Sequence, residues 1–491
     1  MNGGTVRGLG GVVIDGYVFS PLSSAITATQ TSIPVADASI FVTAWQSGSV
    51  NSLIVDGEAL FINDISGNTI SVNRAAAGSS TAALSHTAGT PVRLAGNQLL
   101  VTGSNTVYRD IEIMNSDPLR NWNTDGAEGL RGAGVTNVGN GNKFVNLNVH
   151  DNLIGIFCSS ASSNSELTGN VIYNNGMFTD TDKGAGHGLY LENASGYSRV
   201  YDNIVLNNFA LGAQLYGRTA AYPGGDIQGN VLANSGSPLG YPLRHYNLLV
   251  GTETQRLTDI LIQNNFLFHP HNLNGYNMIF GYGAGADNGS VLSNYFVGGG
   301  AIGLEVTDAT NVTATGNKFY TANSSAINIQ SHQASYTVNN NTYYGTAANS
   351  AKYGNITAGE NQTFTQWRSS TGFDAASTTN SNPLPDTVIL RPNTYSAGRA
   401  NIVVFAPSAP ASITVNLTQA GLANGQAYTI QNAYNYNGTP VFSGVYNSAA
   451  PSISIPLNGS AASVVTPVGS SYTPPTTSPH LAVFVVRPVT Q

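Results

Sequence analysis

The segments LTGNVIYNN (167–175), VYDNIVLNN (200–208) and IQGNVLANS (227–235) decide the fold, because they are copies of one pattern. Each copy has an asparagine followed by an apolar alternation. Three further copies are IQNNFLFHP (262–270), ATGNKFYTA (314–322) and VNNNTYYGT (338–346). The aligned asparagines are Asn170, Asn203, Asn230, Asn265, Asn294, Asn317 and Asn341. Self-similarity of this kind is typical of a repeat architecture.

The shortest spacings between these asparagines, from 294 to 317 and from 317 to 341, are 23 and 24 residues. Three short strands and three turns need about that length, which is one coil of a parallel β-helix. The alternation with period two favours strands over helices. An asparagine at each turn suits a ladder of side-chain amides that bond from coil to coil. We therefore interpret the asparagines as structural.

A second register follows the first, coil by coil. Its segments are GIFC (155–158), GLYL (188–191), GAQL (212–215), NLLV (247–250), NMIF (277–280), GLEV (303–306) and AINI (326–329). In this register Phe157, Tyr190, Gln214, Leu249 and Ile279 are equivalent. Two residues further on, Ser159, Glu192, Tyr216 and Gly251 are equivalent. We expect one patch to present Tyr190, Glu192, Gln214 and Tyr216.

Several coils carry extra residues between the two registers. The insertions are 116–134, 176–188, 236–247 and 270–277, and one more, 217–225, leaves from the far end of the second register. Because coils stack, loops inserted at one turn project from one side and would wall a groove along the helix. Long loops on a rigid scaffold are where binding and catalysis usually occur.

The composition excludes some classes of function. Charged residues make up 9% of the chain and the formal net charge is −7, so there is no basic surface for nucleic acid. No apolar run is long enough to span a membrane. The N-terminus lacks the pattern of a signal peptide, so we expect any export signal to have been removed. The single cysteine, Cys158, is expected to be buried and inert.

The chain resembles the pectin-lyase-like superfamily over roughly residues 100–350, and we expect the β-helix itself to span residues 96–350. This resemblance implies an all-β fold, namely a right-handed parallel β-helix, and a polysaccharide or glycan as partner. The superfamily contains polysaccharide lyases, glycoside hydrolases, epimerases and phage tailspikes. The resemblance further implies a location outside the cytoplasm: secreted, periplasmic, or on a cell or virion surface.

Further units flank the helix. We expect residues 1–19 to form its first coil, 20–95 a small inserted β module, 351–385 a transition segment and 386–491 a β-sandwich. The module resembles short β modules of phage fibres and bacterial surface proteins. The sandwich is expected either to cap the end of the helix or to bind carbohydrate.

Two short strings are similar to motifs of polygalacturonase-type hydrolases. NTDG (123–126) would supply Asp125, and GHG (186–188) would supply His187. The family's paired-aspartate motif has no counterpart, with HDN (150–152) the nearest string, and its Arg-x-Lys motif is missing.

A hydrolase needs two carboxyl groups beside the sugar bond, whereas a lyase needs a base and a cation beside a uronate. Carboxylates outnumber cations in the loops, which slightly favours hydrolysis. The predicted catalytic residues are His187, Glu192, Tyr190, Asp151 and Asp125. The predicted substrate-binding residues are Trp122, Arg131, His150, Gln214, Tyr216, Arg244 and His245. Asp180 and Asp182 are candidate ligands for Ca²⁺. The alternative is a non-catalytic glycan-binding, tailspike-like or structural protein, with a homo-oligomer possible in either case.

Overall fold

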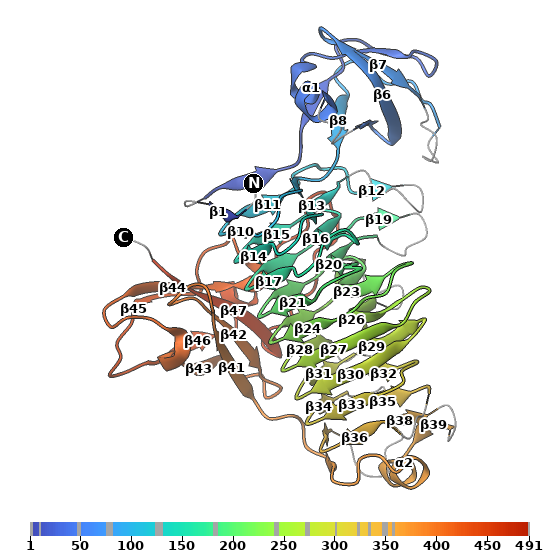
Figure 1. Ribbon diagram of the computed structural model, residues 1–491. Coiled ribbons are helices and arrows are strands. Elements are labelled where there is room, and N and C mark those ends of the chain that lie inside the picture. The colour runs from blue at the N-terminus through green and yellow to red at the C-terminus, as the bar shows by residue number, and fades with distance from the viewer. Residues whose placement is uncertain are drawn as a thin grey trace.

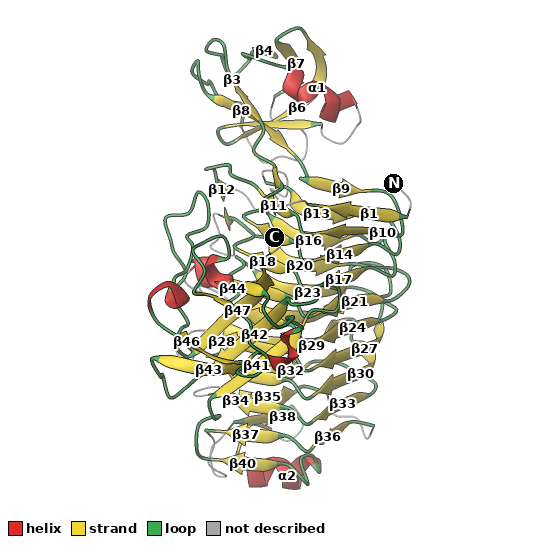
Figure 2. Cartoon of the chain, turned by 90° about the vertical axis from the view of Figure 1, so that its left-hand side faces the viewer, coloured by secondary structure: helices red, strands yellow, loops and turns green. Residues whose placement is uncertain are grey.

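A computed structural model describes residues 3–8, 11–46, 51–74, 82–122, 131–179, 185–239, 245–270, 275–299, 302–321, 325–331, 335–345, 352–355 and 359–489. Three long sheets run side by side down one elongated body (Figures 1 and 2). Each coil of the chain contributes one strand to each sheet, so consecutive coils pair in parallel. Crossovers between parallel strands are right-handed, and the fold is a right-handed parallel β-helix, as the sequence predicts.

The first sheet begins each coil. Its strands in spatial order are β1 (Gly4–Arg7), β10 (Thr106–Arg109), β14 (Lys143–Val145), β17 (Glu166–Thr168), β21 (Ser198–Tyr201), β24 (Gly225–Gln228), β27 (Leu257–Gln263), β30 (Ala286–Leu292), β33 (Val312–Thr315) and β36 (Thr337–Asn339).

The second sheet follows the asparagine turn. Its strands are β2 (Val13–Asp15), β11 (Glu112–Met114), β15 (Asn148–His150), β18 (Val171–Tyr173), β22 (Ile204–Leu206), β25 (Val231–Ala233), β28 (Phe266–His269), β31 (Tyr295–Gly298), β34 (Lys318–Tyr320), β37 (Thr342–Tyr344) and β40 (Thr378–Asn380).

The third sheet closes each coil and contains the second sequence register. Its strands are β9 (Leu99–Val101), β13 (Ala133–Asn137), β16 (Ile154–Cys158), β20 (His187–Leu191), β23 (Leu211–Gly217), β26 (His245–Thr252), β29 (Gly275–Gly283), β32 (Ile302–Val306), β35 (Ser325–Ile329), β38 (Tyr353–Asn355) and β39 (Gly359–Gln362). Only the last pair, β38 and β39, is antiparallel.

The asparagine ladder between the first and second sheets forms as the sequence predicts. Asn170 donates from its side-chain amide to Asn203 at 2.8 Å, and Asn203 donates to Asn230 at 2.9 Å. The same bond continues through Asn265, Asn294, Asn317 and Asn341. A second, shorter ladder of Asn152, Asn175 and Asn208 lies at the turn between the second and third sheets. Buried amides that satisfy one another fix the register of the coils.

The core between the three sheets is continuous and apolar. It includes Phe144, Ile172, Leu189, Leu232 and Phe296, all of them buried. Cys158 belongs to this core, and burial raises the pKa of its thiol to about 11, which agrees with an inert cysteine.

A small module is inserted in the first coil, between β2 and β9. Its six-stranded sheet comprises β3 (Phe19–Pro21), β8 (Pro91–Ala95), β5 (Ser52–Val55), β6 (Glu58–Ser66), β7 (Thr69–Asn73) and β4 (Ser32–Pro34), with the helix α1 (Ser39–Gln46). It has a core of its own and stands at one end of the β-helix (Figure 1).

The C-terminal unit has two antiparallel sheets. The larger contains β41 (Thr387–Pro392), β42 (Ala400–Phe405), β47 (Leu481–Pro488), β44 (Ala427–Asn432) and β45 (Phe442–Val445), and the smaller β43 (Ser412–Asn416) and β46 (Ser452–Pro456). Short 3₁₀ helices connect them: η2 (Thr418–Ala420), η3 (Ala433–Asn435) and η4 (Gly459–Ala462).

This sandwich lies along the side of the β-helix, against the outer face of the second sheet (Figure 1). The expectation that it caps the helix end is therefore wrong. The cap is α2 (Phe364–Thr371), whose Phe364 and Trp367 extend the apolar core at that end. The physical reason is that the second sheet's outer face is apolar, and a sheet face of that kind needs a cover.

Candidate functional site

The outer face of the third sheet brings one row of predicted residues together. Phe157 pairs with Tyr190, Tyr190 with Gln214 and Gln214 with Leu249, which is the register read from the sequence. The row continues through Ile279 to Glu305 and Asn328. Side chains of one row on a parallel sheet lie about 4.8 Å apart from strand to strand. Tyr190 and Gln214 are therefore neighbours on one surface.

A second row lies at the ends of the same strands. The backbone of Glu192 bonds to Cys158, one residue before Ser159, and Tyr216 pairs with Gly251. One step further, the amide of Glu253 donates to the carbonyl of Arg218 at 3.1 Å. Tyr216 faces the same side as Tyr190 because side chains alternate along a strand. Glu192, Arg218 and Glu253 lie just beyond the ends of their strands, and their charges act on Tyr190 or Tyr216, so they lie near the same surface.

Tyr190 and Glu192 form a pair on this surface. Burial and a hydrogen bond to the Glu192 carboxylate raise the pKa of Tyr190 well above its ordinary value, and nearby Arg218 opposes the effect. The hydroxyl therefore donates and stays protonated at neutral pH. Burial, Glu253 and Tyr282 likewise raise the pKa of Tyr216. The two tyrosines act as hydrogen-bond donors and apolar platforms rather than as bases.

Aromatic contacts extend this surface along the helix. The rings of Phe157 and Tyr190 lie 5.3 Å apart, and those of Tyr216 and Tyr282 lie 6.2 Å apart. Tyr282 is 45% exposed. Rings at the edge of a polar surface present both an apolar face and a polar tip, which suits a sugar.

His187 begins the same strand and lies beside Tyr190, with their rings at 88° and 5.5 Å. Burial and nearby His245 lower the pKa of His187 to about 4, so it is neutral at pH 7. Burial also lowers the pKa of His245 to about 4, and His245 is 3% exposed. His245 packs on Gly236 in the turn between coils and does not reach the outer face.

A second tyrosine–carboxylate contact lies further down the same sheet. The hydroxyl of Tyr246 donates to Glu305 at 3.1 Å, and Gln330 donates to the other oxygen of Glu305. The ring of Tyr246 lies 5.0 Å from that of Tyr276. Glu305 is only 3% exposed, so this pair is a closed contact.

His150 and Asp151 lie elsewhere, in a buried network between the helix and the sandwich. His150 donates to Asp151 at 2.8 Å and to Glu112 at 3.0 Å, and its ring stacks on Tyr173 at 4.7 Å. Burial works against its protonation, but the two carboxylates prevail and raise the pKa of His150 to about 9. The protonated His150 is therefore a structural partner of the Asp151 carboxylate.

Two buried arginines complete the network. Arg120 donates to the Asp151 carboxylate at 2.9 Å and, together with His150, keeps the pKa of Asp151 low against the effect of burial. Arg131 is fully buried and donates to the carbonyl of Asp151 at 2.6 Å and to that of Val468 at 3.2 Å. Burial and nearby Arg120 lower the pKa of Arg131 to about 9. The structure does not bring Arg131, His150 or Asp151 to the outer face of the third sheet.

Some predicted residues lie outside the described part of the chain: Asp125, Asp180, Asp182 and Arg244. Trp122 belongs to β12 (Asn121–Trp122), which pairs in parallel with β19 (Phe178–Thr179), so two successive insertions leave the helix at one corner. Between Ala233 and His245, a third insertion at this corner contains η1 (Ser237–Leu239). Among the described residues, no cluster of three or more His, Cys, Asp or Glu could hold a metal.

Three residues of this sheet were not predicted from the sequence: Arg218, Glu253 and Glu305. Extending the two registers would have found them: Glu305 occupies the place of Tyr190 in GLEV, and Arg218 lies two residues after Tyr216. With them, the described surface holds two exposed or half-exposed carboxylates, one arginine and several tyrosines. Such a surface can bind a polyhydroxylated chain by stacking and hydrogen bonds, and it can move a proton between carboxyl groups.

No protein-family model matches the sequence, and no curated protein matches it significantly. Among solved structures, the Dettilon tailspike protein gp208 is 12% identical, with 79% of this chain and 80% of that chain covered and a TM-score of 0.31. The A-module of the Azotobacter vinelandii mannuronan C-5 epimerase AlgE4 is also 12% identical, with 58% and 78% covered and a TM-score of 0.29. The tailspike protein gp49 of Pseudomonas phage LKA1 is 8% identical, with 99% and 86% covered and a TM-score of 0.17.

The described residues contain two α-helices of eight residues each, and neither is long and apolar enough to cross a membrane. The pairing of the strands themselves establishes the fold. The chain is a right-handed parallel β-helix protein with an inserted β module and a lateral β-sandwich.

Proposed function

We propose that this protein binds an extended polysaccharide on the outer face of the third sheet and hydrolyses it there. The observation that carries this proposal is the grouping of Glu192, Arg218 and Glu253 just after the ends of consecutive strands, beside Tyr190, Tyr216 and Tyr282. In a chain that is only 9% charged, two carboxylates and an arginine on one aromatic surface are unusual. The combination matches what cleavage of a glycosidic bond requires.

The spacing of the two carboxylates supports hydrolysis. Glu192 follows β20 and Glu253 follows β26, with β23 between them. Two strand separations, together with an offset of two residues along the strands, place their backbones about 12 Å apart. Inverting hydrolases hold their carboxyl groups about 6.5–9.5 Å apart, which leaves room for a water molecule. Modest side-chain convergence would bring Glu192 and Glu253 into this range, so we assign an inverting reaction.

The protonation states favour hydrolysis over elimination. A lyase needs a base that removes the proton beside a uronate. Tyr190 stays protonated because its pKa is raised, and His187 is a weak base because its pKa lies at about 4. Glu192 and Glu253 are the remaining proton-transfer groups of the described surface.

The test is a polysaccharide panel incubated with the wild-type protein and with E192Q and E253Q. Each variant is expected to lose at least about 100-fold of the cleavage rate, the usual contribution of a positioned acid or base. The control is D259N, an exposed aspartate on the first sheet whose replacement preserves the bond from Asn288. Full cleavage by both glutamate variants would overturn the assignment. A product that absorbs as an unsaturated uronate would indicate elimination instead.

A second candidate function is glycan binding without cleavage, as in a structural or adhesive protein. It is supported by the buried hydrogen bonds of Asp151 and His150, which remove one predicted catalytic residue and one predicted substrate-binding residue from the surface. This candidate would be favoured if no substrate is cleaved and if E192Q and E253Q bind a glycan with the same affinity as the wild type. Light scattering of the same sample tests whether the chain forms an oligomer.

The low charge and the solubilising Asn, Ser, Thr and Gly residues support a location outside the cytoplasm or on a virion. Fractionation of the source cells or particles tests this location, and recovery in the cytoplasm alone would contradict it.

A further inference from the structure

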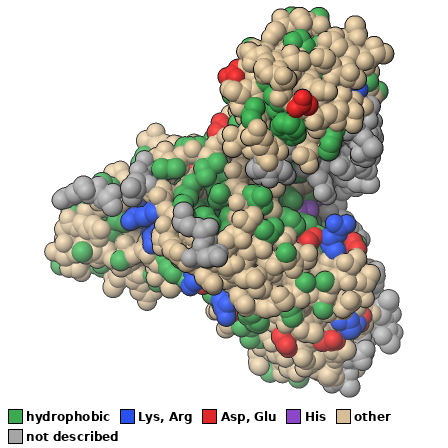
Figure 3. Space-filling model, turned by 45° about the horizontal axis from the view of Figure 1, so that its top comes forward, with side chains coloured by type: hydrophobic (Ala, Val, Ile, Leu, Met, Phe, Trp, Pro, Cys, Tyr) green, Lys and Arg blue, Asp and Glu red, His purple; other side chains and the backbone are tan. Residues whose placement is uncertain are grey.

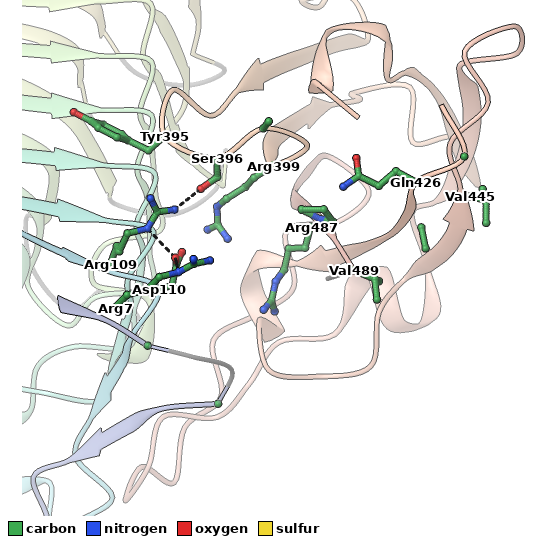
Figure 4. A pocket seen from close by; sticks show the side chains of 16 residues that line it. Arg7, Arg109, Asp110, Tyr395, Ser396, Arg399, Gln426, Val445, Arg487 and Val489 are labelled. Carbon is green, nitrogen blue, oxygen red and sulfur yellow. Dashed lines mark hydrogen bonds and ion pairs between the residues drawn. The ribbon is translucent and has the colours of Figure 1, made fainter. Parts of the chain in front are cut away.

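A large cavity lies between the β-helix and the sandwich, away from the third sheet. It has a volume of about 870 Å³, within the usual range for ligand sites. Figure 4 shows Arg7, Arg109 and Asp110 on the helix side, with Arg399 and Arg487 on the sandwich side. We call this cavity the arginine cleft.

The arginine cleft is positively charged, whereas the molecule as a whole has a negative net charge. Four of the 18 lysines and arginines of the chain line it, against one carboxylate, Asp110. Charged side chains are sparse over the face of the molecule in Figure 3, where uncharged side chains and backbone predominate. A local excess of positive charge in a protein with a net charge of −7 attracts anions to that place.

Two of the four arginines, Arg109 and Arg399, form hydrogen bonds between the helix and the sandwich. Arg109 donates to Asp110 and, across the domain junction, to Ser396, each at 2.9 Å. Arg399 is 7% exposed and donates to Tyr436 at 3.0 Å and to the carbonyl of Gly169 at 3.2 Å. The Arg109–Ser396 and Arg399–Gly169 bonds join the helix to the sandwich and fix the walls of the cleft.

The other two arginines are not used to join the domains. Among the described residues, the Arg7 side chain donates to Asp110 alone, from Nε at 3.1 Å, and it is 53% exposed. The Arg487 side chain is exposed and lies over the Tyr436 ring at 5.4 Å, and its guanidinium donates no hydrogen bond to a described residue. The terminal nitrogens of Arg7 and Arg487 are thus available from opposite walls.

The remaining titratable groups near the cleft do not cancel this charge. Asp110 is already bonded by both Arg7 and Arg109. A smaller cavity of 260 Å³ shares Asp110, Arg399 and Arg487 and adds Glu112. Glu112 accepts hydrogen bonds from His150 and Asn437. Like charges on facing walls repel, and an anion between them removes this repulsion.

We propose that the arginine cleft binds an acidic saccharide through its oxyanion groups. A planar guanidinium matches a carboxylate or sulfate with two parallel hydrogen bonds. Arg7 and Arg487 donate hydrogen bonds to the anionic group, while Arg109 and Arg399 keep the helix and the sandwich in place on either side of it. Gln426 from the sandwich offers an amide for hydroxyl groups. This site is separate from the cleavage surface and does not depend on it.

The experiment is calorimetric titration of the full chain, in the E192Q background so that nothing is cleaved. The probes are a hexamer of galacturonate, a sulfated chondroitin hexasaccharide, a neutral cellohexaose and inorganic phosphate. We expect the acidic oligosaccharides to bind, with affinity falling as NaCl rises, and cellohexaose not to bind in the cleft. The two acidic probes show whether carboxylate or sulfate is preferred.

The variants R7Q and R487Q locate the binding. Each is expected to weaken binding of the preferred acidic probe about tenfold, the loss of a charge-assisted contact. R199Q, an arginine on the first sheet away from the cleft, is the matched control and should bind as the parent does. Unchanged affinity in both cleft variants, or no binding of either acidic probe, would overturn the inference. Phosphate binding alone would also overturn it, since the cleft would then hold a free ion rather than a saccharide.

This outcome is distinguishable from failure of the proposed hydrolysis. Cleavage is measured through E192Q and E253Q on the panel, whereas cleft binding is measured through R7Q and R487Q without turnover. Either result stands without the other.

Discussion

The outer faces of the second and third sheets arise from the same coils, yet the sandwich covers the second, whereas the third stays partly exposed from Phe157 to Gln214. On the second sheet, Val171, Ile204 and Phe266 pack with Val403, Phe405 and Val483 of the sandwich. On the third, the equivalent outward positions hold Phe157, Tyr190 and Gln214, which stay partly exposed. The difference lies in the outward residue of each strand: the apolar face is covered by the sandwich, and the mixed aromatic and polar face is the one that we propose binds the polysaccharide.

The largest expected effect on the free energy of unfolding comes from a substitution in the covered face. Phe405 is 1% exposed and its ring lies 5.9 Å from Phe266 and 6.0 Å from Tyr320. F405A should lower the free energy of unfolding by about 3–5 kcal/mol, the cost of a large cavity in a core. F157A, on the available face, should cost less than about 1 kcal/mol. Urea unfolding of the two variants measures the contrast, and equal losses would show that the faces do not differ as described.

The next effect concerns Asp151, which the sequence predicts as catalytic and the structure places in a buried ion pair. D151N leaves Arg120 buried without its full counter-charge, so we expect a loss of about 3 kcal/mol in unfolding free energy. Cleavage by the folded variant should remain near wild type. Normal stability with abolished cleavage would restore Asp151 to the catalytic group.

A smaller effect is the dependence of stability on pH. The pKa of His150 is about 9 in the folded protein and 6.5 in the unfolded chain. Its contribution to the free energy of unfolding is therefore complete below pH 6.5 and is lost as the pH rises through 9. Between pH 6.5 and about pH 8.5 the loss is about 2 kcal/mol. H150Q should flatten this alkaline limb in urea titrations. An alkaline limb of the same steepness in H150Q would assign it to another group.

The acid limb has the opposite sign. Burial lowers the pKa values of His187 and His245 to about 4 and that of His269 to about 3, so the unfolded chain binds more protons. Stability should be complete above pH 6.5 and fall as pH drops toward 4. The maximum is therefore expected near pH 6.5. A protein most stable below pH 5 would contradict the neutral, buried state of these histidines.

The smallest expected effect probes the available face. Y216A removes a half-buried ring beside Tyr282, so glycan affinity should fall about tenfold while unfolding changes by less than about 1 kcal/mol. Binding of the panel glycan to E192Q and to E192Q with Y216A gives the comparison. Unchanged affinity would move the ligand off this face.

Much of the fold could be predicted because a coil repeats its pattern. The asparagines at 170, 203 and 230 mark one turn, and the register of Tyr190 with Gln214 follows from counting. The lateral position of the sandwich was not predicted, although the strands VIY (171–173) and IVL (204–206) are apolar throughout. A continuous apolar strand indicates burial on both faces, and this signal was available.

The site could be predicted only in part. Tyr190, Glu192, Gln214 and Tyr216 share a surface because strand register is regular. The positions of His150 and Arg131 were not predictable, because their partners Glu112 and Val468 come from another coil and another domain. Side chains in contact across a domain junction leave no periodic mark in the sequence.

The most direct measurement is a crystal structure of E192Q with the longest panel glycan that it binds. The account predicts sugar density along the outer face of the third sheet, from Tyr190 past Tyr216 to Tyr282, with a glycosidic bond near residue 192 and Glu253. Density confined to the sandwich or to the first sheet, with this face empty, would contradict it.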